Sequence, residues 1–205
     1  MRAVIICSGE IKNYEYILSF ITPDDTVICA DGGYDHAVKM GIIPNIVLGD
    51  MDSVKGDYTS VRFEKFPVEK NWTDSELAVN YVIENGFSEA VLFGCTGTRA
   101  DHSLSNIFLL KYLEKNNVSA VIINDKNMIY MPPHGIKIKG KKDDIISVIP
   151  IGGQVTGYTT KGLYYSADDM VLEFGKTLGN SNSMLSDECE VSWKTGEAIV
   201  IKTHD

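Results

Sequence analysis

Cysteine is scarce in this 205-residue sequence, occurring four times with no CxxC pair. Three of the four thiols (Cys7, Cys29, Cys95 and Cys189) lie in or at the end of apolar runs, which is typical of buried, reduced cysteines. Two disulfides are possible by count but nothing in the spacing favours them. The four histidines show no metal-ligand spacing, so the sequence does not predict a zinc site. We therefore expect a reduced, cytoplasmic protein.

Positive charge is also scarce, since 19 basic residues face 28 acidic ones and the net charge is −9. A field of this sign repels phosphate backbones, which argues against a general role in binding nucleic acid. A small anionic ligand stays compatible with the sequence, because a local cluster or a metal ion can reverse the sign within one pocket.

No apolar run approaches the roughly 20 residues that a membrane-spanning helix needs. Residues 1–10 are too short and too soon interrupted by polar residues for a signal peptide, and they resemble a buried first strand. The sequence also lacks a P-loop and a G-x-S-x-G motif, and no G-x-G-x-x-G follows the first apolar run, which disfavours a dinucleotide site.

The first 125 or so residues alternate between short apolar runs and amphipathic stretches. Such alternation predicts an open parallel sheet with helices on both faces. The expected strands are residues 3–7, 27–30, 46–48, 90–93 and 118–123, and the expected helices are residues 14–20, 34–40, 74–84 and 103–116. The third helix has the strongest signals, because Thr73 and Glu76 match a capping box and Asn85-Gly86 can end the helix.

After about Asn127 the pattern changes to short β-type segments separated by glycine-rich turns. This pattern is typical of a small antiparallel sandwich or barrel. We expect a boundary near residues 125–135, with an α/β, Rossmann-like domain over 1–128 and an antiparallel β-sandwich over 129–205. The expected strands are residues 136–139, 145–149, 155–160, 163–165, 170–174, 190–193 and 198–202.

Carboxylates and glycines collect where the predicted parallel strands end, which is where open α/β sheets bind ligands. Asp50 and Asp52 follow the third strand two residues apart, so an extended backbone would point both the same way. Paired carboxylates of this kind suit Mg²⁺ together with substrate phosphates. An ordinary polar turn explains the pair about equally well when it is taken alone.

Two glycine-containing segments could hold phosphate groups. Asp31-Gly32-Gly33 leads into a helix, and residues 94–101 form a Gly/Thr loop that carries Arg99. Backbone N–H groups and a guanidinium are the donors that a polyphosphate needs. Taken alone, Asp31-Gly32-Gly33 is better explained as an ordinary strand-to-helix turn, and Asp74 as an acidic residue that stabilises the dipole of the helix it begins. Taken together, they indicate magnesium-dependent phosphoryl chemistry, in which positioning and charge neutralisation suffice.

These segments, in this order, resemble the thiamine pyrophosphokinase family. Residues 31–33, 44 and 49–53 resemble its D-G-G…P…G-D-x-D-S block, and residues 70–76 its K-D-x-T-D-x-E block. Residues 94–102 with Asn106 resemble G-x-x-G-x-R-x-D-H…N, and residues 162–165 and 181–182 resemble G-L-x-W and S-N. Asn71 and Tyr165 depart from the usual Asp and Trp. Each block is weak alone, but five in register are specific.

The resemblance implies transfer of pyrophosphate from ATP to the hydroxyl of thiamine, with AMP released. It also implies Mg²⁺ as cofactor and a homodimer whose thiamine site lies at the subunit interface. From the net charge and the short apolar runs we expect no nucleic-acid or membrane partner. The residues that the resemblance assigns are catalytic Asp50, Asp52, Asp74 and Asp101, the first three also as metal ligands; ATP-binding Asp31, Gly32, Gly33, Thr73, Gly97, Arg99, His102 and Asn106; and thiamine-binding Tyr165, Ser181 and Asn182.

Three alternatives stay open at this point. A related pyrophosphokinase could act on another heterocyclic alcohol, such as a pterin. A non-catalytic nucleotide or thiamine sensor would fit the two departures at Asn71 and Tyr165. A metal-dependent phosphate hydrolase would use the same carboxylates but would need no alcohol.

Overall fold

The computed structural model describes residues 1–49, 63–65 and 72–204. Contacts within the chain divide it into two compact units, Met1–Asp125 and Lys126–Asp205. The first unit contains the four described helices, and the second is built from strands.

The first unit is built on a parallel sheet with the strand order β4-β3-β2-β1-β5-β6. Its strands are β1 (Arg2–Ile6), β2 (Thr26–Ala30), β3 (Ile46–Gly49), β4 (Phe63–Lys65), β5 (Glu89–Phe93) and β6 (Ser119–Ile123). Its helices are α1 (Tyr14–Leu18), α2 (Gly33–Lys39), α3 (Asp74–Glu84) and α4 (Ala100–Lys115). The expected open parallel sheet is confirmed; β4 was not predicted.

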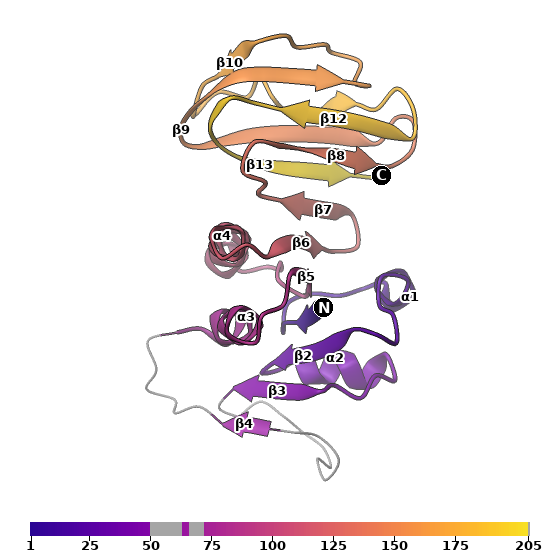
Figure 1. Cartoon of the computed structure of the whole chain (residues 1–205). Coiled ribbons are helices and arrows are strands. Elements are labelled where there is room, and N and C mark those ends of the chain that lie inside the picture. Colours follow the sequence, from indigo (N-terminus) through magenta and orange to yellow (C-terminus); the bar gives the residue numbers. More distant parts are fainter. Residues whose placement is uncertain (50–62, 66–71, 205) are drawn as a thin grey trace. The chain divides into compact units, whose positions relative to one another are not determined.

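Helices cover both faces of this sheet. Figure 1 shows α3 and α4 on one side of the strands and α1 and α2 on the other. Covered strands must be apolar on both faces, and Ile5, Ile28 and Leu92 are indeed inaccessible to solvent. Burying a side chain of this kind contributes about 1.5–3 kcal/mol.

The helix starts follow their local sequences. The Thr73 hydroxyl accepts a hydrogen bond from the Glu76 N–H at 3.2 Å, so α3 begins as its capping box predicts. The expected start of α4 at Ser103 was wrong by three residues. The helix begins at Ala100 after Arg99, which makes no side-chain cap. Ser103 instead hydrogen-bonds back to the carbonyl of Arg99 at 2.9 Å, inside the first turn.

The second unit is antiparallel throughout its described pairings. Its strands are β7 (Asn127–Tyr130), β8 (Gly135–Lys139), β9 (Ile145–Lys161), β10 (Met170–Leu172), β11 (Asn182–Ser183), β12 (Glu188–Ser192) and β13 (Thr195–Thr203). Strands β7 and β11 were not predicted. The expected strand at residues 163–165 is reduced to one bridge between Leu163 and Met184.

Strand β9 corrects the expectation of two separate strands at residues 145–149 and 155–160. The chain continues as one strand of 17 residues through Gly152-Gly153. Its first part pairs with β13, and its last residues pair with β12. A strand that changes partners along its length joins two layers, and glycine at Gly152 and Gly157 accommodates the positive φ values of +70° and +71°.

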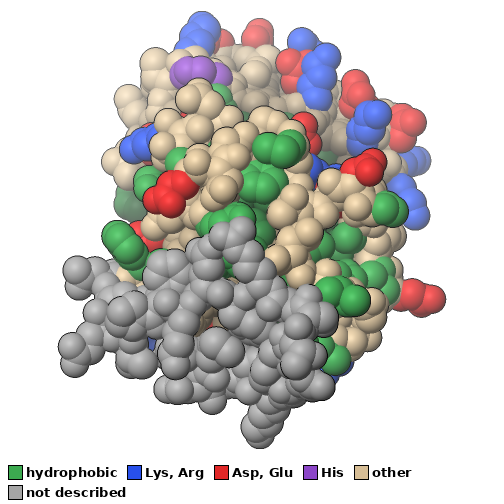
Figure 2. All heavy atoms as spheres, turned by 60° about the horizontal axis from the view of Figure 1, so that its bottom comes forward, with side chains coloured by type: hydrophobic (Ala, Val, Ile, Leu, Met, Phe, Trp, Pro, Cys, Tyr) green, Lys and Arg blue, Asp and Glu red, His purple; other side chains and the backbone are tan. Residues whose placement is uncertain are grey.

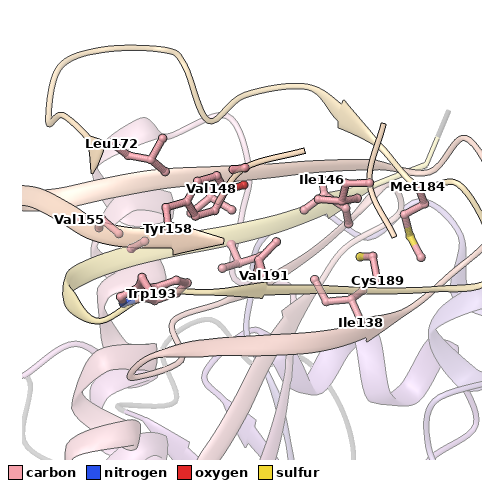
Figure 3. Packing of buried hydrophobic residues seen from close by; sticks show 14 residues of the cluster. Ile138, Ile146, Val148, Val155, Tyr158, Leu172, Met184, Cys189, Val191 and Trp193 are labelled. Carbon is pink, nitrogen blue, oxygen red and sulfur yellow. The ribbon is translucent and has the colours of Figure 1, made fainter. Parts of the chain in front are cut away.

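A hydrophobic core fills the space between these layers. Figure 3 shows Val148, Tyr158 and Leu172 facing Val191 and Trp193 across the core. The core also includes Ile138, Ile146, Met184 and Cys189. This packing confirms the predicted antiparallel β-sandwich.

One face of the molecule carries charge of both signs. On the face drawn in Figure 2, acidic and basic side chains are interspersed and hydrophobic side chains also reach the surface. Among the described residues, no helix has the length and apolar character that crossing a membrane requires.

Candidate functional site

The centre of the parallel sheet is the point where its strand order reverses. From β1 the chain adds β2, β3 and β4 on one side, and then β5 and β6 on the other. Ligands of open α/β sheets bind outside the carboxyl ends of the strands at such a reversal. A cavity of about 370 Å³ lies there, lined by residues 7–10 after β1, residues 94–99 after β5, Ser75 of α3, and His102, Ser103 and Asn106 of α4.

Two loops approach closely to form the floor of this cavity. The Gly9 N–H donates to the Gly94 carbonyl at 2.7 Å, and the Glu10 N–H donates to the Thr96 carbonyl at 3.0 Å. Gly94 has a φ of +63°, and a Cβ there would collide with the carbonyl of Cys7. Only glycine meets both conditions, so this glycine is required by the approach of the two loops.

Arg99 and Asp101 form a two-point ion pair at the edge of the cavity. Arg99 Nη2 lies 2.6 Å from Asp101 Oδ2, and Nε lies 3.2 Å from Oδ1. The Arg99 hydrogen bond, helped by the His102 N–H, lowers the pKa of Asp101 to about 2. A carboxylate of such low pKa is a poor proton acceptor at neutral pH. A phosphate bound by Arg99 would compete with Asp101 for the guanidinium.

Asn106 and Ser103 hold the loop after β5 in place. The buried Asn106 amide donates from Nδ2 to the Cys95 carbonyl at 2.9 Å. The Gly97 N–H donates to Ser103 Oγ at 3.0 Å. His102 and Asn106, one turn apart on α4, both line the cavity. The amide of Asn106 thus supports a cavity loop.

The start of α3 lies beside the same cavity. Thr73 caps the helix, Asp74 begins it, and Ser75 lines the cavity. Helix N-termini favour anions and anionic side chains, so the first turn of α3 suits a phosphate or an acidic residue that faces a metal ion.

Asp31 has an unusual environment at the end of β2. Its backbone has a φ of +44°, which costs roughly 1 kcal/mol for a residue other than glycine. Its Oδ1 atom is buried and has no hydrogen-bond partner in the structure as described. A buried carboxylate oxygen without a partner costs free energy, and a cation or a donor from a ligand would satisfy it. Gly32 and Gly33 follow it directly, and Gly32 lies beside Ser8 of the cavity.

The predicted aspartate pair lies outside the described residues, so the structure does not report the positions of Asp50 and Asp52. Within the parts that are described, no three His, Cys, Asp or Glu side chains gather closely enough to hold a metal ion.

Two side chains support the loop after β1 from behind. His36 Nε2 lies 2.8 Å from the Gly9 carbonyl, and Nδ1 lies 2.8 Å from the Tyr14 hydroxyl. A carbonyl only accepts hydrogen bonds, so Nε2 carries the proton and Nδ1 of the neutral ring accepts from Tyr14. Burial lowers the pKa of His36, which agrees with a neutral ring.

The second unit has its own cavity of about 320 Å³, lined by ten residues that include Tyr158, Tyr165, Met170, Leu178 and Asn182. Of the predicted thiamine-binding residues, Tyr165 and Asn182 line it. Ser181 is exposed and does not line it, and its N–H donates to Ser147 Oγ at 3.1 Å.

Comparisons with known proteins agree across both units. A sequence model described as "Thiamin pyrophosphokinase, catalytic domain" matches residues 18–122, and one described as "Thiamin pyrophosphokinase, vitamin B1 binding domain" matches residues 133–200. The thiamine pyrophosphokinase of Bacillus subtilis is 32% identical, with all of each chain covered. The chain belongs to the thiamine pyrophosphokinase family.

Solved structures of thiamine pyrophosphokinases have the same fold. The Bacillus subtilis structure superposes with a TM-score of 0.91 at 27% identity and covers all of both chains. The Geobacillus thermodenitrificans structure gives a TM-score of 0.88 at 24% identity, covering 100% of this chain and 98% of the other.

Several residues that line the first cavity were not selected from the sequence. Residues 7–10 carry no motif that marks them, and neither Ser75 nor Ser103 was selected. The signal that could have found residues 7–10 is the position of the first strand. A central strand ends in the middle of the edge formed by the carboxyl ends of the parallel strands, which we call the rim. That strand order depends on pairings that the sequence does not display.

Proposed function

We propose that this protein transfers the pyrophosphoryl group of ATP to the hydroxyl of thiamine, giving thiamine diphosphate and AMP. The full-length similarity to a thiamine pyrophosphokinase carries this proposal. The cavity at the strand-order reversal supports it, because donors from two loops and two helix starts converge there.

ATP is proposed to bind along this rim, in the α/β domain of residues 1–128. Arg99, His102 and the backbone of Gly97 would face the phosphates, with Asn106 holding the loop that carries them. Asp31, Gly32, Gly33 and Thr73 border the same rim. The unpartnered Asp31 oxygen could accept a hydrogen bond from the nucleotide.

The residues available for a magnesium ion are hard oxygen donors, as this ion prefers. We assign Asp50, Asp52 and Asp74 as its ligands. The buried Asp31 oxygen, which has no hydrogen-bond partner in the structure as described, supports a cation at this rim, because a positive charge would satisfy it. When bound, Mg²⁺ would neutralise phosphate charge and favour one orientation of the chain of phosphates.

Thiamine is proposed to bind the β-sandwich unit, residues 129–205, at the cavity of Tyr165 and Asn182 with Ser181 nearby. Large apolar side chains of this unit are exposed, namely Tyr164, Tyr165, Met170, Val171, Phe174, Leu178 and Leu185, and three of them, Tyr165, Met170 and Leu178, line the cavity. Exposed apolar surface of this extent favours an interface. We therefore propose a homodimer in which this surface is covered and completes the thiamine site.

The proposed step is an in-line displacement. The thiamine hydroxyl oxygen attacks the β-phosphorus of ATP, the bond from that phosphorus to the α–β bridging oxygen breaks, and AMP leaves with that oxygen. One of two rim aspartates, Asp74 or Asp101, is proposed to orient or deprotonate the hydroxyl.

The experiment is to incubate the protein with ATP, Mg²⁺ and thiamine and to follow AMP and thiamine diphosphate by mass spectrometry. Equal, thiamine-dependent appearance of both products is expected. AMP without any acceptor would indicate a hydrolase, and product from a pterin alcohol in competition would indicate a different acceptor. ATP binding without AMP release would indicate a sensor.

Asp50→Asn separates the catalytic role from a structural one. We expect turnover to fall at least ~100-fold with little change in the free energy of unfolding, because the lost charge acts on the phosphates. Asp24→Asn is the matched control, since the exposed Asp24 precedes β2 at the opposite edge of the sheet. A variant that unfolds without a selective loss of activity would return Asp50 to a structural role.

The homodimer has its own test. Phe174→Glu places a charge in the exposed apolar surface and should shift the mass measured by light scattering from dimer to monomer. Val38→Glu, an exposed apolar residue of the first unit, is the control. A wild-type monomer at working concentration would overturn the dimer.

The four free, buried thiols support the proposal of a reducing, cytoplasmic location.

A further inference from the structure

Two cysteine sulfurs lie together at the floor of the first cavity. Cys7 follows β1 and Cys95 follows β5, and their Sγ atoms are 3.4 Å apart. Both residues line the cavity, although each is only 2–3% exposed. The proposed reaction uses neither thiol.

The surrounding backbone holds the two sulfurs in this position. The Cys7 N–H donates to the Phe93 carbonyl at 2.8 Å, and the Cys95 carbonyl accepts from Asn106 at 2.9 Å. The Cys7 sulfur accepts hydrogen bonds from the Cys95 thiol and, at 3.4 Å, from Ser75 Oγ. These contacts favour a thiolate at Cys7 rather than at Cys95.

The other two cysteines provide an internal comparison. Cys29 on β2 is inaccessible to solvent, lines neither described cavity, and burial strongly raises its pKa. Cys189 lies in the sandwich core, where burial raises its pKa to about 11. Neither has a hydrogen bond to another cysteine among those the structure describes.

We propose that Cys7 and Cys95 are an oxidation site, at which a hydroperoxide converts the two thiols into a disulfide across the floor of the cavity. The Cys7 thiolate attacks one peroxide oxygen, the O–O bond breaks, and a sulfenic acid forms as one water or alcohol leaves. The Cys95 sulfur then attacks the sulfenic sulfur, the S–S bond forms and a water leaves. The two thiols lose two electrons and two protons, and the peroxide gains them.

A disulfide between Cys7 and Cys95 would change the geometry of the cavity floor. A disulfide has a sulfur separation of about 2.05 Å, so the two Sγ atoms must approach by roughly 1.4 Å from the present 3.4 Å. The Cys7 sulfur would also lose its role as acceptor for Ser75, which follows Asp74 in α3. Oxidation should therefore rearrange the side chains at the floor of the cavity and reversibly lower any activity that depends on their positions.

The experiment treats the reduced full-length protein with hydrogen peroxide, alkylates the remaining thiols after unfolding, and identifies cross-linked peptides by mass spectrometry. A Cys7–Cys95 peptide pair lacking two hydrogen atoms is expected. Loss of these thiols should be ~10-fold faster than loss of Cys29 and Cys189, and a thiol reductant should reverse it. This readout needs no catalysis, so its failure would leave the proposed function standing.

Single Cys→Ala variants test which two thiols form the disulfide. Cys29→Ala and Cys189→Ala should form the disulfide as the wild type does, whereas Cys95→Ala should stop at a sulfenic acid on Cys7. If Cys95→Ala fails to fold, the relative alkylation rates of the wild-type thiols decide. The proposal would be overturned if Cys29 or Cys189 were oxidised as fast as Cys7 and Cys95. It would also be overturned if the Cys7 and Cys95 thiols could still be alkylated after peroxide treatment.

Discussion

Asn182 holds the backbone of Tyr165 through two opposed hydrogen bonds. The Tyr165 N–H donates to Asn182 Oδ1 at 2.9 Å, and Asn182 Nδ2 donates to the Tyr165 carbonyl at 2.7 Å. The Asn182 side chain is buried while Tyr165 is 66% exposed beside the cavity. The amide therefore fixes the backbone from which an exposed aromatic ring projects.

Asn182→Ala should weaken both stability and thiamine binding. Removing two hydrogen bonds to backbone groups costs roughly 2 kcal/mol in the free energy of unfolding. The loosened Tyr165 should raise the KM for thiamine ~10-fold, with a smaller change in kcat. Urea unfolding and steady-state kinetics measure both. A higher KM at unchanged stability would show instead that the amide contacts thiamine directly.

Arg99→Gln should raise the pKa of Asp101 from about 2 toward its usual 3.8, because the guanidinium hydrogen bond is the largest cause of the shift. With the pKa lowered in the folded state, any stability from this pair is present above pH 3.8. It is lost as the pH falls through about 2. Titration of the Asp101 carboxyl carbon by NMR measures the shift. Arg2→Gln, whose arginine pairs with Asp25, should leave Asp101 unchanged.

Gly94→Ala should destabilise the first unit by about 1–3 kcal/mol, since a Cβ there meets the Cys7 carbonyl at a φ of +63°. Gly97→Ala is the matched control in the same loop. Its Cβ would have only ordinary contacts, the nearest at 3.5 Å from the Glu10 nitrogen. Equal midpoints in thermal unfolding for the two variants would contradict the close approach of the loops.

His36→Gln should remove part of the dependence of stability on pH. Burial lowers the pKa of His36 below its usual 6.5, so the unfolded chain binds the proton more readily. The wild type should therefore keep this contribution above pH 6.5 and lose it as the pH falls through the lowered folded-state value. Urea midpoints at about pH 7.5 and about pH 5.5 measure the difference. The exposed His134→Gln should retain the wild-type dependence.

Much of the fold was predictable because its signals are local. Helix α3 begins at its capping box and has the predicted bounds, and the apolar runs give five strands of the parallel sheet to within a residue or two. Strand β9 was not predictable in this way. Gly152-Gly153 is typical of a turn, but pairing with β13 and β12 extends the strand through it.

The sequence by itself determined five strands of the parallel sheet, the capped start of α3 and the family, because periodicity, caps and motifs lie within a few neighbouring residues. Tertiary structure alone decided that β1 is central and that Cys7 meets Cys95, because strand order brings together residues far apart in the chain. Tertiary structure also decided which groups the polar side chains pair with. Asp101 pairs with Arg99 and Asn182 with Tyr165, since a polar side chain hydrogen-bonds to whichever groups the packed backbone places within reach.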